Sequence, residues 1–396
     1  MDRMDFVRIG QAAGAQGAIE AQLGAPRFGT GGILDAGLRA QQAMMAAGKL
    51  TAHSLTSQYL ARIRTLGQAI IEINSAALKI ALDMDRERHL RRLRGPLHGI
   101  PVLLQDNIAT ADRMRTTPQP SAPAGVHALR DAHLVARLRA AGAVVIGKTN
   151  TANGAGNGAA VAVGLATLAL GAEADDNCAV PAAMHGLVGV KPTPGLVSRS
   201  GVGVGVGVGA ADGMPGPLAR CVADAAAMLA AMSGVDAEDE ATEAAAGRSS
   251  DYYAQLDADG LRGVRIGVLR NGFGVCAERD MVIEKALFDL AAQGAVLFDA
   301  ELRAGTPDSA AAVEELLRAQ HFGALVGASG GGLPSSARHP HVTVPAGYVQ
   351  DQPVGLALVG PAFGEAALLR MAYAYEQATL HRRSPQMPAS VSLARA

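Results

Sequence analysis

The chain has 396 residues and a formal net charge of −1, and its residues are 49% apolar and only 3% aromatic, with no Trp. This length allows one large α/β domain or two smaller ones. The near-neutral charge argues against nucleic acid or an anionic membrane as the main partner. No stretch is predicted to cross a membrane, because the apolar run 159–170 is too short.

The cysteines and the amino terminus predict the compartment. Cys178, Cys221 and Cys276 have no metal-ligand spacing and cannot all pair within the chain. A reducing compartment is therefore the simplest interpretation. The first residues mix acidic and basic side chains and contain no long apolar core, so they include no evident signal peptide. We expect a cytoplasmic protein, whose oligomeric state the sequence does not give.

Residues 1–31 are weakly patterned, and the regular helical pattern begins after them. Apolar residues then recur at helical spacing in several segments, the second of which has Thr51 or Ser54 as its cap. The segment 82–94 is rich in charge of both signs and is typical of a solvated helix face. The predicted helices are Ile33–Lys49, Ser54–Leu66, Asp131–Ala141, Ala159–Leu170, Ala219–Ser233, Met281–Ala292 and Glu365–Thr379.

Short apolar runs between these helices predict buried strands. Strands that alternate with helices favour an α/β fold with a partly parallel sheet covered on both sides. The Gly-Val repeat 201–209 fits an edge strand or a loop, and the polar segment 237–250 is a connection that could link two lobes. The predicted strands are Ile100–Leu104, Ala143–Gly147, Gly186–Val190, Val264–Leu269, Ala295–Phe298, His341–Gly347 and Val354–Gly360, with a turn around Asp351 in the final pair.

The stretch from Asn153 to Gly195 is the centre of the predicted organisation. A glycine turn feeds the apolar run 159–170, which we predict to be a buried helix that ends at Gly171. A polar loop, 172–181, follows and carries Glu173, Asp175 and Asp176 before the next buried strand. A loop between a core helix and a core strand is a usual place for a functional site.

Five sequence blocks around this stretch resemble the amidase signature family, and bacterial peptide amidases look most similar. The blocks appear in the family's order, and the resemblance covers most of the chain. It implies a mixed, largely parallel sheet with helices on both faces. We expect one domain over 32–396, and a smaller lobe around 237–340 is an alternative that the sequence does not exclude. The blocks are HGIPV-x-x-x-DN at 98–107, GKTN at 147–150, PAA-x-x-GLVG-x-KPT-x-G at 181–195, VPAGY at 344–348 and PVGLALVG at 353–360.

The resemblance implies hydrolysis of a small carboxamide or peptide amide by a Ser, cis-Ser, Lys triad, without metal or cofactor. By the family's spacing, Gln105 occupies the position of the proton-accepting Lys, Asn153 that of the bridging Ser and Asn177 that of the nucleophile. An amide neither accepts a proton at neutral pH nor attacks a carbonyl as an alcohol does. We expect the three positions to cluster and to leave the chain catalytically impaired.

The resemblance also assigns the supporting positions. The turn that supplies the oxyanion hole in the family is occupied here by Ala174, Asp175, Asp176 and Asn177. A carboxylate at Asp176 that pointed inward would oppose a developing negative charge. Asp106, Asn107 and Gly154 match site-supporting positions, and we expect Asp106 and Asp175 to accept backbone hydrogen bonds that orient their loops.

Other candidate groups are weaker. Cys178 and His185 would need to meet in space to act as a nucleophile and its base, and a buried structural Cys is the commoner case. His98 is more typical of a structural histidine, and Lys148 belongs to a block where the triad needs no base. Two hypotheses remain open. One is an impaired amidase, and the other is a pseudoenzyme, a non-catalytic scaffold that binds an amide or a partner.

Overall fold

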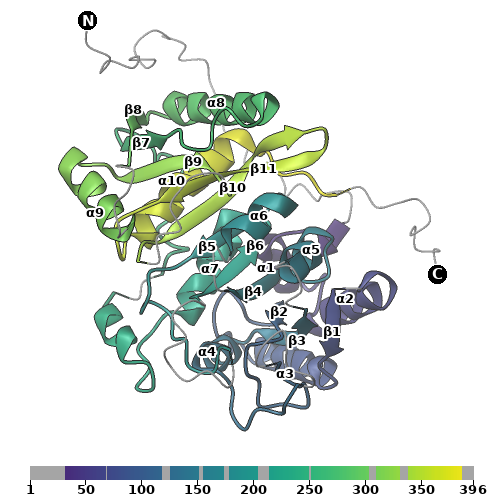
Figure 1. Cartoon of the computed structure of the whole chain (residues 1–396). Coiled ribbons are helices and arrows are strands. Elements are labelled where there is room, and N and C mark those ends of the chain that lie inside the picture. The colour runs from purple at the N-terminus through teal and green to yellow at the C-terminus, as the bar shows by residue number, and fades with distance from the viewer. Residues whose placement is uncertain are drawn as a thin grey trace, which may run out of the picture.

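The computed structural model describes residues 32–67, 69–117, 125–150, 155–173, 178–203, 214–248, 251–302, 309–330 and 338–385. Ten helices surround one sheet in this part of the chain (Figure 1). The helices are α1 (Leu38–Ala46), α2 (Ala52–Leu66), α3 (Ala77–His89), α4 (His133–Ala140), α5 (Ala155–Ala162), α6 (Ala179–His185), α7 (Val222–Met232), α8 (Ala277–Ala292), α9 (Ser309–Gln320) and α10 (Glu365–Thr379), with short 3₁₀ turns at Gly32–Leu34 and Glu240–Ala245.

The described strands form a single 11-stranded sheet in the order β1-β3-β2-β4-β6-β5-β10-β11-β9-β7-β8. In Figure 1 it runs from β1 at the bottom to β7 and β8 at the top. The strands are β1 (Ile70–Ile73), β2 (Pro101–Gln105), β3 (Val144–Thr149), β4 (Leu168–Glu173), β5 (Val188–Lys191), β6 (Met214–Ala219), β7 (Arg265–Leu269), β8 (Val296–Ala300), β9 (Ala324–Ala328), β10 (His341–Val349) and β11 (Gln352–Val359).

The sheet is mixed, as predicted, but the expectation that it is largely parallel is wrong, because antiparallel pairs outnumber parallel ones among the described strands. Strand β2 runs parallel to β3 and β4, and β7 runs parallel to β8 and β9. The six other pairs are antiparallel. The β10–β11 pair is a hairpin whose turn residues Gln350 and Asp351 have positive φ, which confirms the turn predicted there.

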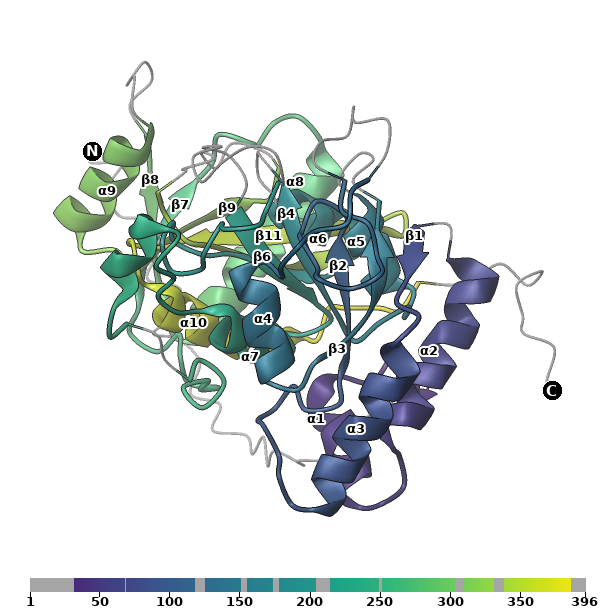
Figure 2. The same ribbon diagram turned by 90° about the horizontal axis from the view of Figure 1, so that it is seen from below.

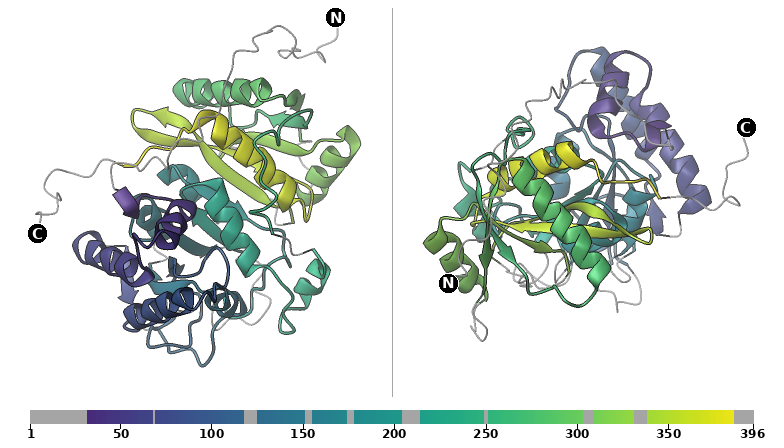
Figure 3. Two further views of the ribbon diagram at one scale, coloured as in Figure 1. Left: turned by 180° about the vertical axis from the view of Figure 1, so that it is seen from behind. Right: turned by 90° about the horizontal axis from the view of Figure 1, so that it is seen from above.

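Helices cover both faces of the sheet. Helices α5 and α6 lie in front of it in Figure 1, and α7 and α10 come to the front when the molecule is seen from behind in Figure 3. Figure 2 shows α1, α2 and α3 gathered at the β1 end. Every residue of β2 and β3 is buried, which is typical of parallel strands covered on both faces. The site described below therefore rests on a rigid, enclosed part of the molecule.

The amino-terminal helices show two kinds of helix start. The Thr51 side chain accepts a hydrogen bond from Ser54 N at 3.0 Å and caps α2, as predicted. Asp85 on α3 accepts hydrogen bonds from the first two backbone N–H groups of α2, Ala52 N at 2.7 Å and His53 N at 2.9 Å. The charged segment 82–94 is thus only partly a solvated face. Arg86 and Asp83 form an exposed ion pair, whereas Asp85 binds the start of the neighbouring helix.

The predicted helix over 159–170 is wrong in its second half. Helix α5 ends at Ala162, Gly164 turns the chain with a φ of +70°, and the end of the apolar run, from Leu168, is in strand β4. Periodicity does not separate a buried helix from a buried strand, because both are apolar all round. Gly171, the predicted helix end, lies inside β4, and the predicted loop 172–181 instead contains the first turn of α6, including Pro181.

Other strands gave no sequence signal. Strand β6 reads MPGPLA, and two prolines and a glycine argue against a central strand, yet β6 lies between β4 and β5. Residues 204–209 of the Gly-Val repeat lie outside the described residues, and Val202 forms an isolated bridge with Ile108. Strands β7, β8 and β9, from the segment 237–340, continue the same sheet.

Candidate active site at the carboxyl end of strand β2

Gln105 is the last residue of β2 and is buried between β3, β4 and α5, with 1% of its surface exposed. Its Oε1 accepts a hydrogen bond from Ala172 N at 2.6 Å and another from Asn157 Nδ2 at 3.2 Å. Asn157 Oδ1 in turn accepts from Thr149 Oγ1 at 2.5 Å. The Gln105 side-chain amide is therefore part of a buried chain of hydrogen bonds.

Gly171 on β4 is the point where side chains from three elements meet. A Cβ added at Gly171 would lie 3.5 Å from Asn157 Nδ2, 3.6 Å from Cys178 Sγ and 3.7 Å from Gln105 Oε1. These residues come from α5, the N-cap of α6 and the end of β2. The tertiary structure thus brings together residues that are up to 73 positions apart in the sequence.

Asn157 and Thr149 are site residues that the sequence motifs did not single out. Both are buried, and both hydrogen-bond into the chain that includes Gln105. The sequence could have indicated Thr149, since it belongs to the GKTN block and directly precedes Asn150. Asn157 lies four positions after Asn153 in the glycine turn, a helical spacing that would have indicated a shared face.

Asp106 and Asn107 continue from Gln105 along the chain. Burial raises the pKa of the Asp106 carboxyl, and a hydrogen bond from Thr117 and the charge of Lys148 partly offset that rise. The backbone N–H of Asp106 donates to Thr149 O at 3.1 Å and extends the pairing of β2 with β3. Asn107 Nδ2 donates to Ala172 O at 2.8 Å. The supporting residues on this side of the site thus bind both neighbouring strands.

The other predicted site positions lie outside the described residues. They are Asn153, Gly154, Ala174, Asp175, Asp176 and Asn177, so the clustering of Gln105 with Asn153 and Asn177 stays a prediction. The helices next to these positions do pack together. A Cβ on Gly158 of α5 would lie 2.6 Å from His185 Nδ1 and 3.1 Å from Pro181 O of α6. The close approach of α5 and α6 at this point needs a glycine.

Cys178 and His185 each contact a main-chain carbonyl. Cys178 is fully buried, and its Sγ donates to Gly216 O at 3.4 Å. His185 Nδ1 lies 2.8 Å from Pro181 O, so this nitrogen carries the proton. These contacts are typical of a structural thiol and a helix-bound histidine, and they give no support to a Cys-His nucleophile.

Lys148 faces away from Gln105. Lys148 pairs with Leu104 across β2 and β3, whereas Gln105 pairs with the next residue, Thr149, and side chains alternate between the faces of a sheet. Lys148 Nζ donates to Ile108 O at 2.5 Å and Thr116 Oγ1 at 2.8 Å. Burial lowers the pKa of Lys148 to about 8, against the attraction of nearby carboxylates. Lys148 therefore holds the segment after β2 and does not reach the hydrogen-bond chain of Gln105.

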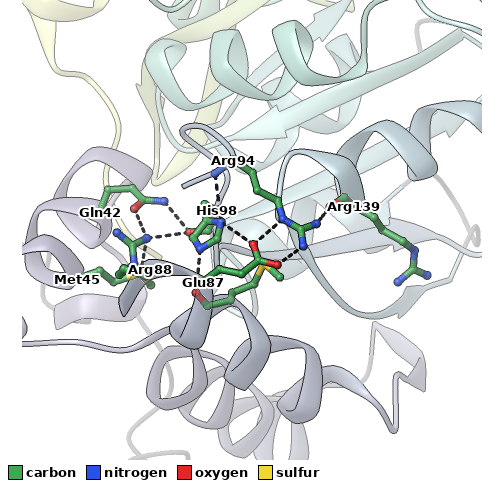
Figure 4. Close-up of polar contacts among 8 residues, drawn as sticks. Gln42, Met45, Glu87, Arg88, Arg94, His98 and Arg139 are labelled. Atoms are coloured by element: carbon green, nitrogen blue, oxygen red, sulfur yellow. Dashed lines mark hydrogen bonds and ion pairs between the residues drawn. The ribbon is translucent and has the colours of Figure 1, made fainter. Parts of the chain in front are cut away.

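His98 lies before β2, at the opposite end of the strand from Gln105, and Figure 4 shows it with its polar neighbours. It is fully buried, and its Nε2 donates to Met84 O at 2.9 Å while Nδ1 accepts from Arg94 N at 3.4 Å. Burial lowers the pKa of His98. Arg88 Nη2 binds both Gln42 Oε1 and His98 O, and Arg94 pairs with Glu87. This cluster ties α1 and α3 to the start of β2, which fits the structural role expected for His98.

Among the described residues, no helix is long and apolar enough to span a bilayer, and no group of three His, Cys, Asp or Glu side chains has an arrangement that would hold a metal ion. In the part of the chain that the structure describes, the side chains linked to Gln105 Oε1 or next to it at Gly171 are the Asn157 amide, the Thr149 hydroxyl and the Cys178 thiol. These side chains are rich in hydrogen-bonding groups, and the carboxyl of Asp106 follows Gln105 in the chain.

Comparison with solved structures supports the resemblance. The native peptide amidase of Stenotrophomonas maltophilia is 34% identical, with a TM-score of 0.81 over 88% of this chain and 98% of that one. An amidase family protein of Bacillus anthracis is 28% identical, with a TM-score of 0.81 over 89% and 92% of the two chains. The fold around Gln105 is therefore shared with amidase structures over nearly their whole length.

Sequence comparison agrees. A probable amidase of Arabidopsis thaliana is 28% identical over 85% of this chain and 89% of its own length. A putative amidase of Arthroderma benhamiae is 34% identical over 61% of this chain, but the match spans only 47% of that relative. The family model Amidase matches residues 54–155 and 153–324. With this match over more than half of its length, and with the shared fold, the chain belongs to the amidase signature family.

Proposed function

We propose that this chain keeps the amidase fold while its hydrolysis of carboxamide C–N bonds is impaired or lost. In amidase signature enzymes the positions of Gln105, Asn153 and Asn177 carry a Lys, a bridging Ser and a nucleophilic Ser. Two asparagines and a glutamine supply neither a hydroxyl nor a base, so no nucleophile is activated. The cytoplasmic location and the small carboxamide or peptide amide ligand belong to the same proposal.

The observation that carries this proposal is the hydrogen bonding of Gln105. Its Oε1 accepts from two N–H groups, those of Ala172 and Asn157, and its carboxamide nitrogen has no basic lone pair. A general base needs a lone pair with a suitable pKa within reach of the proton that it takes. Loss of a key triad member in serine hydrolases lowers kcat by on the order of 10⁴ to 10⁶.

A turnover assay tests the proposal. The chain is incubated with a panel of simple carboxamides and peptide amides, beside its Asn177→Ala variant and a Gln105→Lys, Asn153→Ser, Asn177→Ser triple variant. We expect no turnover from the first two and a rise of at least about 10³-fold in a folded triple variant. Turnover by the unmodified chain that falls in Asn177→Ala would contradict the proposal, because it would show that this position carries chemistry.

A non-catalytic carboxamide-binding role is the second candidate function. The linked side chains of Gln105, Asn157 and Thr149 provide amide and hydroxyl groups of the kind that pair with a carboxamide. Calorimetric titration with acetamide and a dipeptide amide tests this role. Heat of binding that disappears in Asn157→Leu would support it, and equal heat in both chains would place the binding elsewhere.

A further inference from the structure

Ala172 on β4 is held at both of its backbone groups by side chains from the end of β2. Its N–H donates to Gln105 Oε1 at 2.6 Å, and its carbonyl accepts from Asn107 Nδ2 at 2.8 Å. Ala172 is 2% exposed, so solvent does not reach its backbone to replace either bond. A buried backbone N–H or carbonyl without a hydrogen-bond partner is costly, and the two side chains supply the partners that the backbone of Ala172 needs.

The sheet explains why side chains make these bonds. The parallel pairing of β2 with β4 ends at Leu104 and Leu170, so no backbone group of β2 is paired with Ala172. On the other side of β4, Ala172 lies opposite Pro215 of β6, and a proline has no N–H to donate. The side chains of Gln105 and Asn107 therefore extend the hydrogen bonding between β2 and β4 by two residues, from Leu170 to Ala172.

We propose that Gln105 and Asn107 form a strand clamp that fixes the end of β4. In this chain Gln105, at the family's Lys position, has a structural role. Its Oε1 accepts the Ala172 N–H in place of a backbone carbonyl, since the pairing of β2 with β4 ends at Leu170. A lysine could not fill this role, since an ammonium group only donates hydrogen bonds. The strand clamp stands whether or not amide hydrolysis is lost, since its evidence is the bonding of Ala172.

The consequence concerns the turn that follows β4. Ala172 lies two positions before Ala174, where the segment begins that the resemblance assigns to the oxyanion turn. Asn157 helps to orient Gln105, since its Nδ2 donates to the same oxygen at 3.2 Å. The strand clamp thus holds β4 two residues before that segment of the sequence, and a change at residue 105 alters the hydrogen bonding of β4 as well as the group at that position.

Hydrogen exchange of the full-length chain tests the strand clamp. Gln105→Glu keeps an acceptor oxygen, whereas Gln105→Met and Gln105→Lys remove it at similar length. We expect the Ala172 amide to exchange about tenfold faster or more in the Met and Lys variants, and to stay within about threefold of the original rate in the Glu variant. Gln58→Met, on the exposed face of α2, controls for the substitution itself.

A second variant keeps the test decisive if Gln105→Met does not fold. Asn107→Ala leaves the bond to the Ala172 N–H in place and removes only the donor to the Ala172 carbonyl. It should speed exchange across Leu168–Glu173 and lower the Tm by about 2 °C or more. Unchanged exchange over this segment in both Gln105→Lys and Asn107→Ala would overturn the strand clamp. This result does not depend on whether the chain hydrolyses amides, so the strand clamp and the proposed loss of hydrolysis can fail separately.

Discussion

At the scale of single residues, the packing around the site depends on glycines, whose lack of a Cβ leaves space for neighbouring side chains. Gly171 leaves space for Gln105, Asn157 and Cys178 to meet, and an added Cβ would only reach ordinary contact with them. Gly216 on the next strand has no such space, because its Cβ would lie 2.0 Å from Val190 O. These two glycines face the same buried cysteine but differ in how strictly they are required.

A pair of alanine substitutions tests this difference. Gly171→Ala should change the free energy of unfolding by about 1 kcal/mol or less, since the methyl group fits beside its neighbours. Gly216→Ala should lower it by about 3 kcal/mol or more, because a main-chain oxygen cannot move aside without breaking the β5–β6 pairing. Urea unfolding of both variants measures the difference, and equal losses would show that the two strands are looser than the structure implies.

At the scale of elements, two carboxyl groups, the half-buried Glu376 and the buried Asp224, bind helix starts. Glu376 on α10 accepts a hydrogen bond from Val222 N, the first residue of α7, at 2.9 Å, and Asp224 accepts from Leu38 N at the start of α1. Burial raises the pKa of Glu376 to about 8, and the nearby Asp224 adds to that rise. These three helices are thus connected through acidic side chains whose charge is costly to bury.

This connection predicts a pH-dependent stability. Glu376 has a raised pKa in the folded chain and an ordinary value of 4.5 when unfolded, so between these values the folded chain holds the extra proton. The stability that protonated Glu376 contributes to the folded chain is fully present below pH 4.5 and is lost as the pH rises through about 8. Glu376→Gln, which cannot ionise, should therefore become more stable than the original chain as the pH rises from 4.5 to 8. We expect a difference of about 1–2 kcal/mol at pH 8.

Thermal unfolding of both chains across this pH range measures the effect. Glu278→Gln, at an exposed position on α8, controls for the loss of one negative charge and should follow the original chain. A constant difference between Glu376→Gln and the original chain at all pH values would contradict the assignment of the pH dependence to this carboxyl.

Sequence reasoning succeeded with elements that have two distinct faces or clear boundaries. Helix α10 has the predicted bounds, Glu365–Thr379, and the cap at Thr51 is where it was expected. It failed where an element is buried all round, as in the run 159–170, or where the composition opposes the structure, as in β6 with its two prolines. For β6, pairing on both sides outweighs the weak intrinsic preference of its residues.

At the scale of the whole molecule, one core joins the two ends of the sheet. The main cluster of buried residues includes Leu38 and Leu103 near the β1 end and Ile266 and Leu369 near the β7 end. A smaller cluster under α9, which includes Val313 and Phe322, lies beside it. Since the strands of 237–340 share this sheet and most of this core, we expect no independent folding of that segment.

Calorimetry checks this expectation. Heating the full-length chain should give a single unfolding transition whose calorimetric and van't Hoff enthalpies agree. Two separated transitions would support a smaller lobe around 237–340 that unfolds by itself. Limited proteolysis on the same sample would then release a stable fragment that ends near that segment.

The sequence by itself determined the family and the mixed α/β class, because these depend on short blocks whose residues are adjacent in the chain. The same blocks predict that Gln105, Asn153 and Asn177 occupy the triad positions. Only the tertiary structure decided what Gln105 does. Its partners Ala172 and Asn157 are 67 and 52 positions away, and no pattern in the sequence reveals that the β2–β4 pairing stops at Leu170, two residues before Ala172. Hydrogen bonds between distant residues depend on how strands end and pack, so the sequence supplied the group and the fold determined its role.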